Sequence, residues 1–311
     1  MTQCKRILVL GGTGMLGTMT TAVLASHEDF SVTATYRNVQ PLPLSNITWQ
    51  KFDITTLLPD LAAFDGVVNC IGLIKQKIKD AEPEHMRMAE EINTLFPVKL
   101  ADSATQSRTP LIQIATDCVF SGHKGPYDET SPHDASDVYG KTKSRGERPG
   151  SFSHLIRCSV IGPEFGATPV SLLGWFLSQP AGAKITGFTD HLWNGLTTLH
   201  FARLAGAVLR NPEFLPGLRH IVPADAVSKE ELLRLFSASF GRQDITVISH
   251  ATGTPCDRRL TTRYADDNKT LWQAAGHAKI PSIAEMIDEL ARDMPKLFPF
   301  LSAAGKTANQ S

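Results

Sequence analysis

The chain has 311 residues and a globular composition, and its 31 basic residues balance its 31 acidic ones. This balance argues against a nucleic-acid-binding or membrane-binding surface, and no apolar run is long enough to span a bilayer. Five widely spaced cysteines without a CxxC pair argue against a zinc site or a disulfide framework, so we expect a reducing, cytoplasmic location and no metal.

Hydrophobic patterning predicts strands and helices that alternate over the first half of the chain. Strands are expected at 7–10, 31–36, 66–70, 111–115 and 154–157, with a further strand just before Asp53. Helices are expected at 15–25, 84–104, 139–147, 199–209, 230–240 and 283–294. Beyond residue 161, prolines and glycines interrupt the pattern.

This alternation indicates an α/β fold: a Rossmann-type, doubly wound parallel sheet with a smaller C-terminal substrate lobe. We assign 1–160 to a NAD(P)-binding Rossmann domain and 161–311 to a substrate-binding lobe. Within that lobe, the segment at about 195–210 is expected to pack back on the Rossmann domain.

A glycine-rich turn follows the first strand. Gly11, Gly14 and Gly17 have GxxGxxG spacing between an apolar strand and a helix. Glycines so placed allow a tight turn, close approach of the backbone to a pyrophosphate, and close packing of helix on strand. The helix then presents free N–H groups to the phosphates. This context favours a dinucleotide-binding loop over an ordinary turn.

Two polar residues after the second and third strands bear on the choice of dinucleotide. Arg37 follows the second strand, and no acidic residue occurs between Ser31 and Pro41. An acidic residue here would bind the ribose 2′-hydroxyl of NAD, whereas an arginine accommodates the 2′-phosphate of NADP. We therefore expect NADP(H) rather than NAD(H), with an ordinary surface arginine as the alternative. Asp53 could reach the adenine or could be a turn residue.

Tyr139 and Lys143 are the one Tyr–Lys pair with a spacing of four residues, which places both on one face of a helix. A nearby ammonium lowers the pKa of a phenol from about 10 and makes it a usable acid or base. Thr116 ends the strand 111–115, at the edge where open α/β sheets bind ligands, and could bind a substrate oxygen. The alternatives are an incidental helical pair and a turn threonine.

The order of these motifs resembles that of the extended short-chain dehydrogenases/reductases. The matching stretches are Gly11–Gly17, Asn69–Gly72, Ala115–Phe120, Pro126–Glu129, Tyr139–Lys143 and Gly146-Glu147. The series TDxVF, PYxE and YGxxKxxGE is most similar to dTDP-4-dehydrorhamnose reductases and related nucleotide-sugar 4-ketoreductases. The resemblance covers residues 5–210 well and the rest weakly.

The resemblance implies an NADPH-dependent oxidoreductase that reduces a nucleotide-linked 4-keto sugar for deoxysugar or polysaccharide precursors. It implies catalytic roles for Thr116, Tyr139 and Lys143. The implied cofactor contacts are Gly11, Thr13, Gly14, Met15, Leu16, Gly17, Arg37, Asp53, Ile54, Cys70, Ile71, Gly72, Asn93, Tyr139 and Lys143.

Two departures from this resemblance leave the sugar open. Cys118 and Val160 stand where rhamnose reductases usually carry an aromatic residue and a tryptophan. The candidate substrate-binding residues are Asp117, Cys118, Lys184, Arg258 and Arg259. The aromatic residues that could stack on a base, or simply fill the core, are Trp175, Phe176 and Trp193.

Two other functions are compatible with the same motifs. One is a nucleotide-sugar epimerase that uses the same three catalytic residues, and the other is a non-catalytic NADP-binding regulatory subunit. The expected partner is a nucleotide-sugar substrate, with neither nucleic acid nor membrane. A homodimer is left open.

Overall fold

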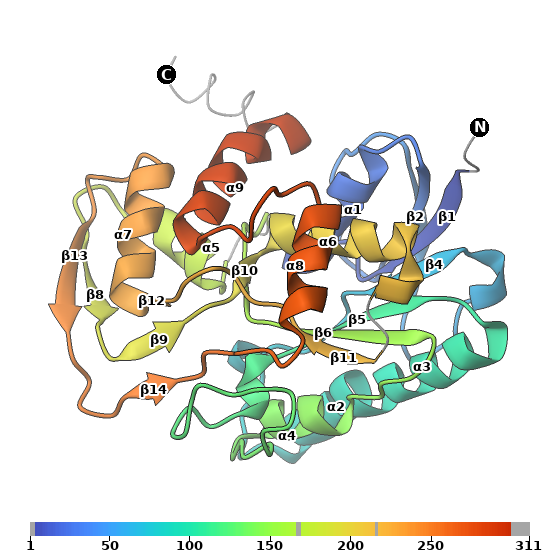
Figure 1. Ribbon diagram of the computed structural model, residues 1–311, viewed down its shortest axis with the longest axis horizontal. Coiled ribbons are helices and arrows are strands. Elements are labelled where there is room, and N and C mark those ends of the chain that lie inside the picture. The colour runs from blue at the N-terminus through green and yellow to red at the C-terminus, as the bar shows by residue number, and fades with distance from the viewer. Residues whose placement is uncertain (1–3, 166–168, 215–216, 300–311) are drawn as a thin grey trace.

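A computed structural model describes residues 4–165, 169–214 and 217–299. Its centre is a parallel sheet of seven strands in the order β11-β6-β5-β4-β1-β2-β3 (Figure 1). These strands are β1 (Lys5–Leu10), β2 (Phe30–Tyr36), β3 (Ile47–Lys51), β4 (Gly66–Asn69), β5 (Leu111–Ala115), β6 (Ser153–Arg157) and β11 (Leu218–His220). The order reverses between β1 and β4, which confirms the predicted doubly wound sheet and marks the point where such sheets bind ligands.

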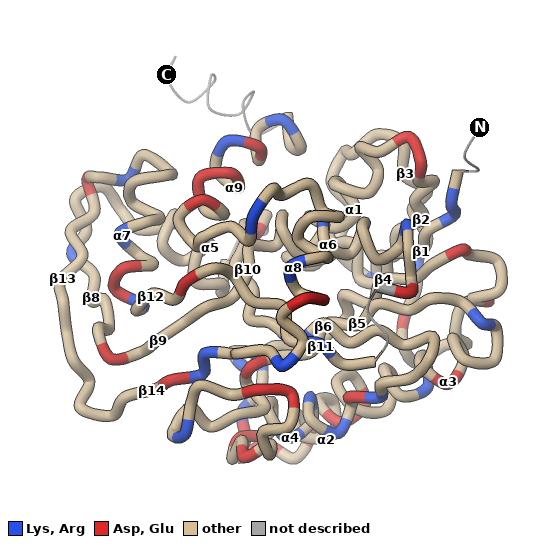
Figure 2. Tube along the Cα trace, viewed as in Figure 1, with Lys and Arg blue, Asp and Glu red and all other residues tan. Residues whose placement is uncertain are grey.

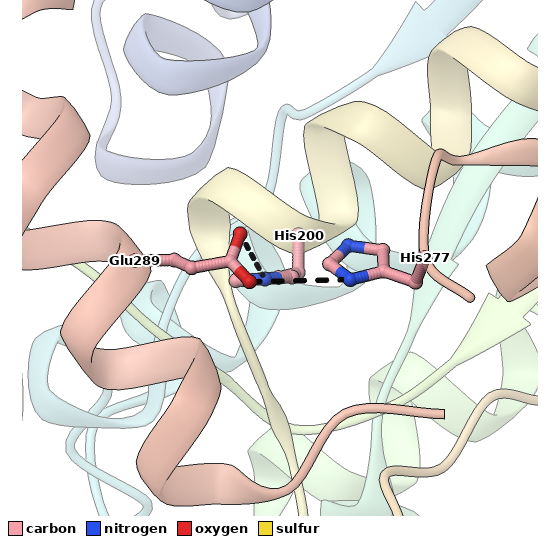
Figure 3. A group of neighbouring side chains, drawn as sticks. All are labelled: His200, His277 and Glu289. Carbon is pink, nitrogen blue, oxygen red and sulfur yellow. Dashed lines mark ion pairs between the residues drawn. The ribbon is translucent and has the colours of Figure 1, made fainter. Parts of the chain in front are cut away.

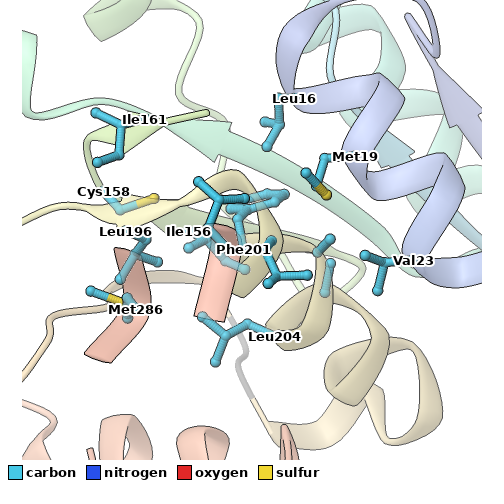
Figure 4. Close-up of a cluster of buried hydrophobic side chains, with 14 of the residues drawn as sticks. Leu16, Met19, Val23, Ile156, Cys158, Ile161, Leu196, Phe201, Leu204 and Met286 are labelled. Atoms are coloured by element: carbon cyan, nitrogen blue, oxygen red, sulfur yellow. The ribbon is translucent and has the colours of Figure 1, made fainter. Parts of the chain in front are cut away.

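Helices cover both faces of this sheet (Figure 1). α1 (Met15–Ala25) and α6 (Thr198–Arg210) pack against each other on one face. The other face carries α2 (Pro83–Glu90), α3 (Phe96–Ser107) and α4 (Val138–Arg145). In Figure 4, Met19 and Val23 of α1 approach Phe201 and Leu204 of α6 within one buried apolar cluster. The burial of this cluster fixes α1, and hence the glycine-rich turn, on the sheet.

The predicted helix 84–104 is present but is not uniform. A π-helical turn, Glu91–Leu95, separates α2 from α3. Pro97 explains the irregularity, because a proline ring clashes with the carbonyl four residues earlier, here that of Asn93, and has no N–H to donate. The wider π-turn accommodates this clash.

The second lobe is built from short strands, which local patterning did not predict, and from helices, two of which match the helices expected at 230–240 and 283–294. Three small sheets contain β7 (Val160–Ile161) with β10 (Leu196–Thr197), β8 (Lys184–Phe188) with β13 (Thr246–His250), and β9 (His191–Trp193) with β12 (Val227–Ser228) and β14 (Cys256–Asp257). The helices are α5 (Leu172–Leu177), α7 (Lys229–Ser239), α8 (Ala265–Ala274) and α9 (Ile283–Leu297). Strand β11 also comes from this part of the chain and extends the central sheet.

Short turns complete the element order. They are 3₁₀ turns at Leu61–Ala63, Lys75–Lys77, Asp117–Val119 and Pro212–Phe214. Acidic and basic residues are interspersed along the chain rather than separated by sign (Figure 2). None of the helices in the described ranges is both long and apolar enough to cross a bilayer.

Candidate active site

The turn after β1 has the shape that the glycine spacing predicts. Gly11 has a φ of +77°, which glycine adopts readily, and its N–H donates to Thr35 Oγ1 over 2.9 Å. A Cβ on Gly17 would lie 2.0 Å from the Gly11 carbonyl oxygen, so only glycine fits there. Gly14 is the N-cap of α1 and no side chain caps this helix, which leaves its first N–H groups open to a phosphate. Thr13, Met15 and Leu16 lie in the same turn.

The ends of β2 and β3 place Arg37 beside Asp53. Arg37 is exposed, and its Nε lies 4.0 Å from Asp53 Oδ2. The N–H and hydroxyl of Thr55 both donate to Asp53 Oδ1, and these hydrogen bonds hold the pKa of the carboxyl below its usual value. Asp53 is therefore a turn residue in this structure, with Ile54 next to it. The Arg37 guanidinium remains accessible to a ligand phosphate.

The loop after β4 packs directly against the glycine turn. The Asn69 side chain accepts a hydrogen bond from Ile71 N (3.0 Å) and donates to Gln113 Oε1 (3.0 Å). A Cβ on Gly11 would come within 2.9 Å of Ile71, so the two loops are in contact. Burial raises the pKa of the Cys70 thiol to about 12, so this cysteine is an un-ionised wall residue. Cys70, Ile71 and Gly72 thus line the switch point between β1 and β4.

The three predicted catalytic residues meet at the carboxyl end of β5. Thr116 caps the 3₁₀ turn that follows β5 and accepts a hydrogen bond from Cys118 N (3.1 Å). Tyr139, in the first turn of α4, interacts with the Thr116 side chain. Lys143 lies one helical turn further on and donates from Nζ to the Ile114 carbonyl oxygen (3.0 Å). Strand β5 and helix α4 therefore bring these side chains together.

The acidity of Tyr139 differs from the expectation that Lys143 lowers it. Burial raises the pKa of Tyr139 above its usual value, and nearby Cys118 and Asp117 raise it further. Lys143 is turned toward the Ile114 carbonyl, and burial lowers its own pKa. The phenol is thus neutral at physiological pH, the state needed to donate a proton.

Asn93 supports the catalytic helix from the π-turn. Its side chain makes two hydrogen bonds with the Leu73 backbone, one with N and one with O, each of 2.9 Å. Its own carbonyl oxygen would lie 1.9 Å from a Cβ on Gly146, so the end of α4 packs directly on the π-turn. A cavity of about 20 Å³ lies beside Lys143, Asn93 and Glu147 and has room for about one water molecule.

Of the predicted substrate-binding residues, three lie beside Thr116. Asp117 is buried, and this burial raises the pKa of its carboxyl. Cys118 is half-buried, and burial raises the pKa of its thiol to about 12. Arg258, from the second lobe, donates to the carbonyl oxygens of Phe120 (2.8 Å) and Ser121 (3.2 Å) and interacts electrostatically with Asp117 and Cys118.

The structure does not bring the other two charged candidates into this cluster. Arg259 is paired with Asp257 through two hydrogen bonds, of 2.8 and 2.7 Å. Lys184 is exposed at the start of β8, which pairs with β13. Among the aromatic candidates, Phe176 and Trp193 are buried in the apolar core and Trp175 is exposed.

Lys229 also faces this cluster, although the sequence analysis did not single it out. It is the first residue of α7, whose start is fixed by a capping box between Ser228 and Glu231. Its ammonium lies over the Trp193 ring, 5.3 Å from the centroid, and interacts electrostatically with Asp117. A capping box predicts where a helix begins, but it does not reveal which distant strand end the helix will face.

The PYxE stretch, Pro126–Glu129, has a structural role in this fold. The Tyr127 hydroxyl accepts hydrogen bonds from Gly122 N and Lys124 N, each of 3.0 Å. The Glu129 carboxylate accepts from His220 N (3.0 Å) and from Thr262 Oγ1 (2.6 Å). These bonds fix the loop between β5 and α4 to β11 and to the second lobe.

A separate, partly buried cluster contains the residues that, among those the structure describes, are best placed to hold a metal. His200, His277 and Glu289 offer ligand atoms within 4.8 Å of one another, and their side chains converge in Figure 3. Arg203 is hydrogen-bonded to Glu289 and also to Asp293 (2.7 Å). Because a guanidinium already supplies positive charge to Glu289, we interpret the cluster as an ion-pair network that holds α6 against α9.

A parallel sheet of this order, a glycine-rich turn after β1 and a Thr–Tyr–Lys group at the strand ends define an extended short-chain dehydrogenase/reductase. A family model described as "RmlD substrate binding domain" matches residues 5–157. A dTDP-4-dehydrorhamnose reductase of Streptomyces griseus is 33% identical over 290 residues, which cover 87% of this chain and 88% of that protein. The chain belongs to the dTDP-4-dehydrorhamnose reductase family.

Other similar proteins include a reductase and two proteins with different functions. The methionine adenosyltransferase 2 subunit beta of Xenopus tropicalis is 28% identical over 153 residues, and the match spans only 42% of that protein. A dTDP-4-dehydrorhamnose reductase from Bacillus anthracis, solved in complex with NADP, has a TM-score of 0.65 at 16% identity and covers 93% of this chain and 99% of its own. A UDP-N-acetylglucosamine 4-epimerase from Methanobrevibacter ruminantium has a TM-score of 0.71 at 15% identity, with coverage of 94% and 99%.

Proposed function

We propose that the protein is an NADPH-dependent reductase of a nucleotide-linked 4-keto sugar. The observation that carries the proposal is the meeting of Thr116, Tyr139 and Lys143 beside the β1–β4 switch point, in a chain that is 33% identical to a dTDP-4-dehydrorhamnose reductase over most of its length. In this role the second lobe, 161–311, receives the nucleotide and the sugar, and 1–160 holds the cofactor. All five cysteines are free thiols, which supports a cytoplasmic location.

The cofactor site is formed by the loops after β1, β2, β3 and β4. The open N–H groups of α1 bind the pyrophosphate, and Arg37 pairs with the 2′-phosphate. Cys70, Ile71 and Gly72, which lie beside this turn, would contact the cofactor. NADPH, when bound, supplies the hydride.

The chain's own residues position the ketone and supply the proton. Thr116 donates a hydrogen bond to the keto oxygen and orients it toward Tyr139. Tyr139, which burial keeps neutral, gives its proton to the developing alkoxide. Lys143, which donates to the Ile114 carbonyl in this structure, would hold the nicotinamide ribose when the cofactor is bound, and its positive charge favours the phenolate that forms.

The test is NADPH oxidation with a panel of dTDP-, UDP- and GDP-linked 4-keto sugars, followed by identification of the product. We expect one nucleotide class to be reduced, with one NADPH consumed for each sugar. Epimerisation without net cofactor oxidation would support the epimerase alternative, which the Methanobrevibacter ruminantium neighbour favours.

A regulatory subunit is the second candidate function. It is favoured by the similarity of 153 residues, 46% of the chain, to methionine adenosyltransferase 2 subunit beta. Tight NADP(H) binding without reduction of any ketone in the panel would support it.

A further inference from the structure

Two positive charges from the second lobe lie beside the catalytic end of β5. Lys229 belongs to α7 and Arg258 follows β14, and each interacts electrostatically with Asp117 and Cys118. Both residues reach this position from elements that are more than a hundred residues away from β5 in the sequence. The tertiary fold, rather than a local turn, therefore brings these two cations to the end of β5.

The Lys229 ammonium has no hydrogen-bond or ion-pair partner within the described part of the chain. It is half-buried, and neither a hydrogen bond nor an ion pair joins it to residues 4–165, 169–214 or 217–299. The indole of Trp193 lies under it, and the Trp193 Nε1 donor is itself buried without an acceptor. A half-buried ammonium without a hydrogen-bond acceptor on the protein is available to an anionic oxygen of a ligand. Burial lowers the pKa of Lys229, and an anionic partner would offset that cost.

The local charges are not balanced by the protein. Arg258 donates to two neutral backbone carbonyl groups, and Lys75, the other cation near Cys118, is already paired with Asp137 at 2.7 Å. Asp117 faces both Lys229 and Arg258. Asp137, which is paired with Lys75, also interacts electrostatically with Arg258. Three cations therefore face two carboxylates here, and the pocket is suited to one further negative charge.

We propose that Lys229 is a substrate-binding residue which, together with Arg258, holds an anionic oxygen of the nucleotide-linked substrate. The inference rests on the proposed function, because it takes the space beside Thr116 and Tyr139 as the sugar site. The oxygen comes from the diphosphate or from a carboxylate on the sugar, and both present the same chemistry to an ammonium. Lys229 thus helps to decide which nucleotide sugar the enzyme accepts.

The test is calorimetric titration of the whole protein, saturated with NADP⁺, with four probes: dTDP, UDP, UDP-glucose and UDP-glucuronic acid. The variants are Lys229→Met and Lys229→Gln, which remove the charge, and Lys229→Arg, which retains it. Lys269→Met, on the exposed surface of α8, is the matched control. Loss of a charge-assisted hydrogen bond is expected to weaken binding about 10- to 100-fold in the first two variants, with recovery in Lys229→Arg.

The probes identify the source of the anionic oxygen. Weaker binding of the nucleoside diphosphates themselves assigns the contact to the diphosphate, and weaker binding of UDP-glucuronic acid alone assigns it to a sugar carboxylate. Equal affinities in Lys229→Met, Lys229→Gln and Lys269→Met for every probe would overturn the proposal. NADP⁺ affinity, measured in parallel, reports whether the fold is intact. This test measures binding, whereas the reductase assay measures turnover. A failure of the proposed function can therefore be told apart from a failure of this proposal.

Discussion

Tyr139 combines a half-buried phenol with a hydroxyl partner, Thr116, at the carboxyl end of β5. Replacement by phenylalanine removes the proton donor and leaves the ring volume unchanged. We expect Tyr139→Phe to reduce turnover about 10²- to 10⁴-fold, with little change in the dissociation constant of NADPH. Lys143→Ala is the informative comparison, since it should impair both turnover and cofactor binding. Near-parental ketone reduction by Tyr139→Phe would remove this residue from the mechanism.

Arg37 governs the predicted cofactor preference. Its guanidinium is exposed and lies 4.0 Å from the Asp53 carboxylate, which is too far for a strong competing hydrogen bond. Arg37→Ala should therefore weaken NADPH binding by about 1.5–3 kcal/mol and leave NADH binding nearly unchanged. Fluorescence titration with both cofactors measures the difference. If the parent protein binds NADH more tightly, the assignment of Arg37 to the 2′-phosphate is wrong.

At the residue scale, the sequence predicted the positions of residues that depend on local spacing. Gly11, Gly17, Thr116 and the Tyr139–Lys143 pair are all tied to a strand end or to a helical turn, and such positions follow from patterning. Lys229 was missed because its neighbour across the site, Asp117, is more than a hundred residues away. The direction of the Tyr139 pKa shift was missed for a similar reason, since burial is a property of the whole fold.

At the scale of elements, α4 carries Tyr139 and Lys143, and its position depends on contact with the π-turn. Gly146→Ala should disturb this contact, because its Cβ would lie 1.9 Å from the Asn93 carbonyl oxygen. Gly146 has a φ of −81°, so the backbone itself tolerates alanine. We expect a loss of about 1–3 kcal/mol in the free energy of unfolding, together with reduced turnover.

Gly150→Ala is the matched control for this prediction, since an added Cβ there has no atom within 4 Å. Denaturant unfolding and steady-state turnover of the two variants provide the comparison. If Gly146→Ala is as stable and as active as Gly150→Ala, the close packing of α4 on the π-turn is not required.

Elements with a clear hydrophobic pattern could be predicted from the sequence. Elements that form only because a distant strand pairs with them could not. The continuous apolar character of β1 and β4 and the helical period of α6 and α9 are local signals. Strands β7, β10, β12 and β14 have only two residues each and exist because a distant strand pairs with them. The π-turn was also hidden, because Pro97 within a helical pattern predicts an interruption but not its geometry.

At the scale of the whole molecule, buried Arg157 at the end of β6 connects the two parts of the chain. Its guanidinium is hydrogen-bonded to Glu147 after α4, to His133 Nε2 (2.8 Å) and to His220 Nε2 (2.8 Å) in β11. His220 Nδ1 in turn donates to the Thr261 carbonyl oxygen (2.8 Å). The network joins the catalytic helix, the central sheet and the second lobe, so its protonation state affects the whole fold.

Burial and the Arg157 guanidinium lower the pKa of His220 from 6.5 to about 4. The folded state therefore binds fewer protons than the unfolded state between these pH values. The stabilisation is complete above about pH 6.5 and is lost as the pH falls toward 4, because a protonated His220 would face Arg157 with a second positive charge. A shift of this size corresponds to about 3 kcal/mol. We expect the free energy of unfolding to fall by an amount of this order over that range.

His220→Gln tests the origin of this pH dependence. Glutamine retains one acceptor for Arg157 and one donor for the Thr261 carbonyl, but it does not titrate. The variant should be less stable than the parent at pH 7 and should show a shallower decline between pH 6.5 and 4. His250→Gln, exposed on β13, should keep the parental slope. Denaturant midpoints measured across this pH range give the slopes directly, and an unchanged slope in His220→Gln would assign the acid sensitivity to other groups.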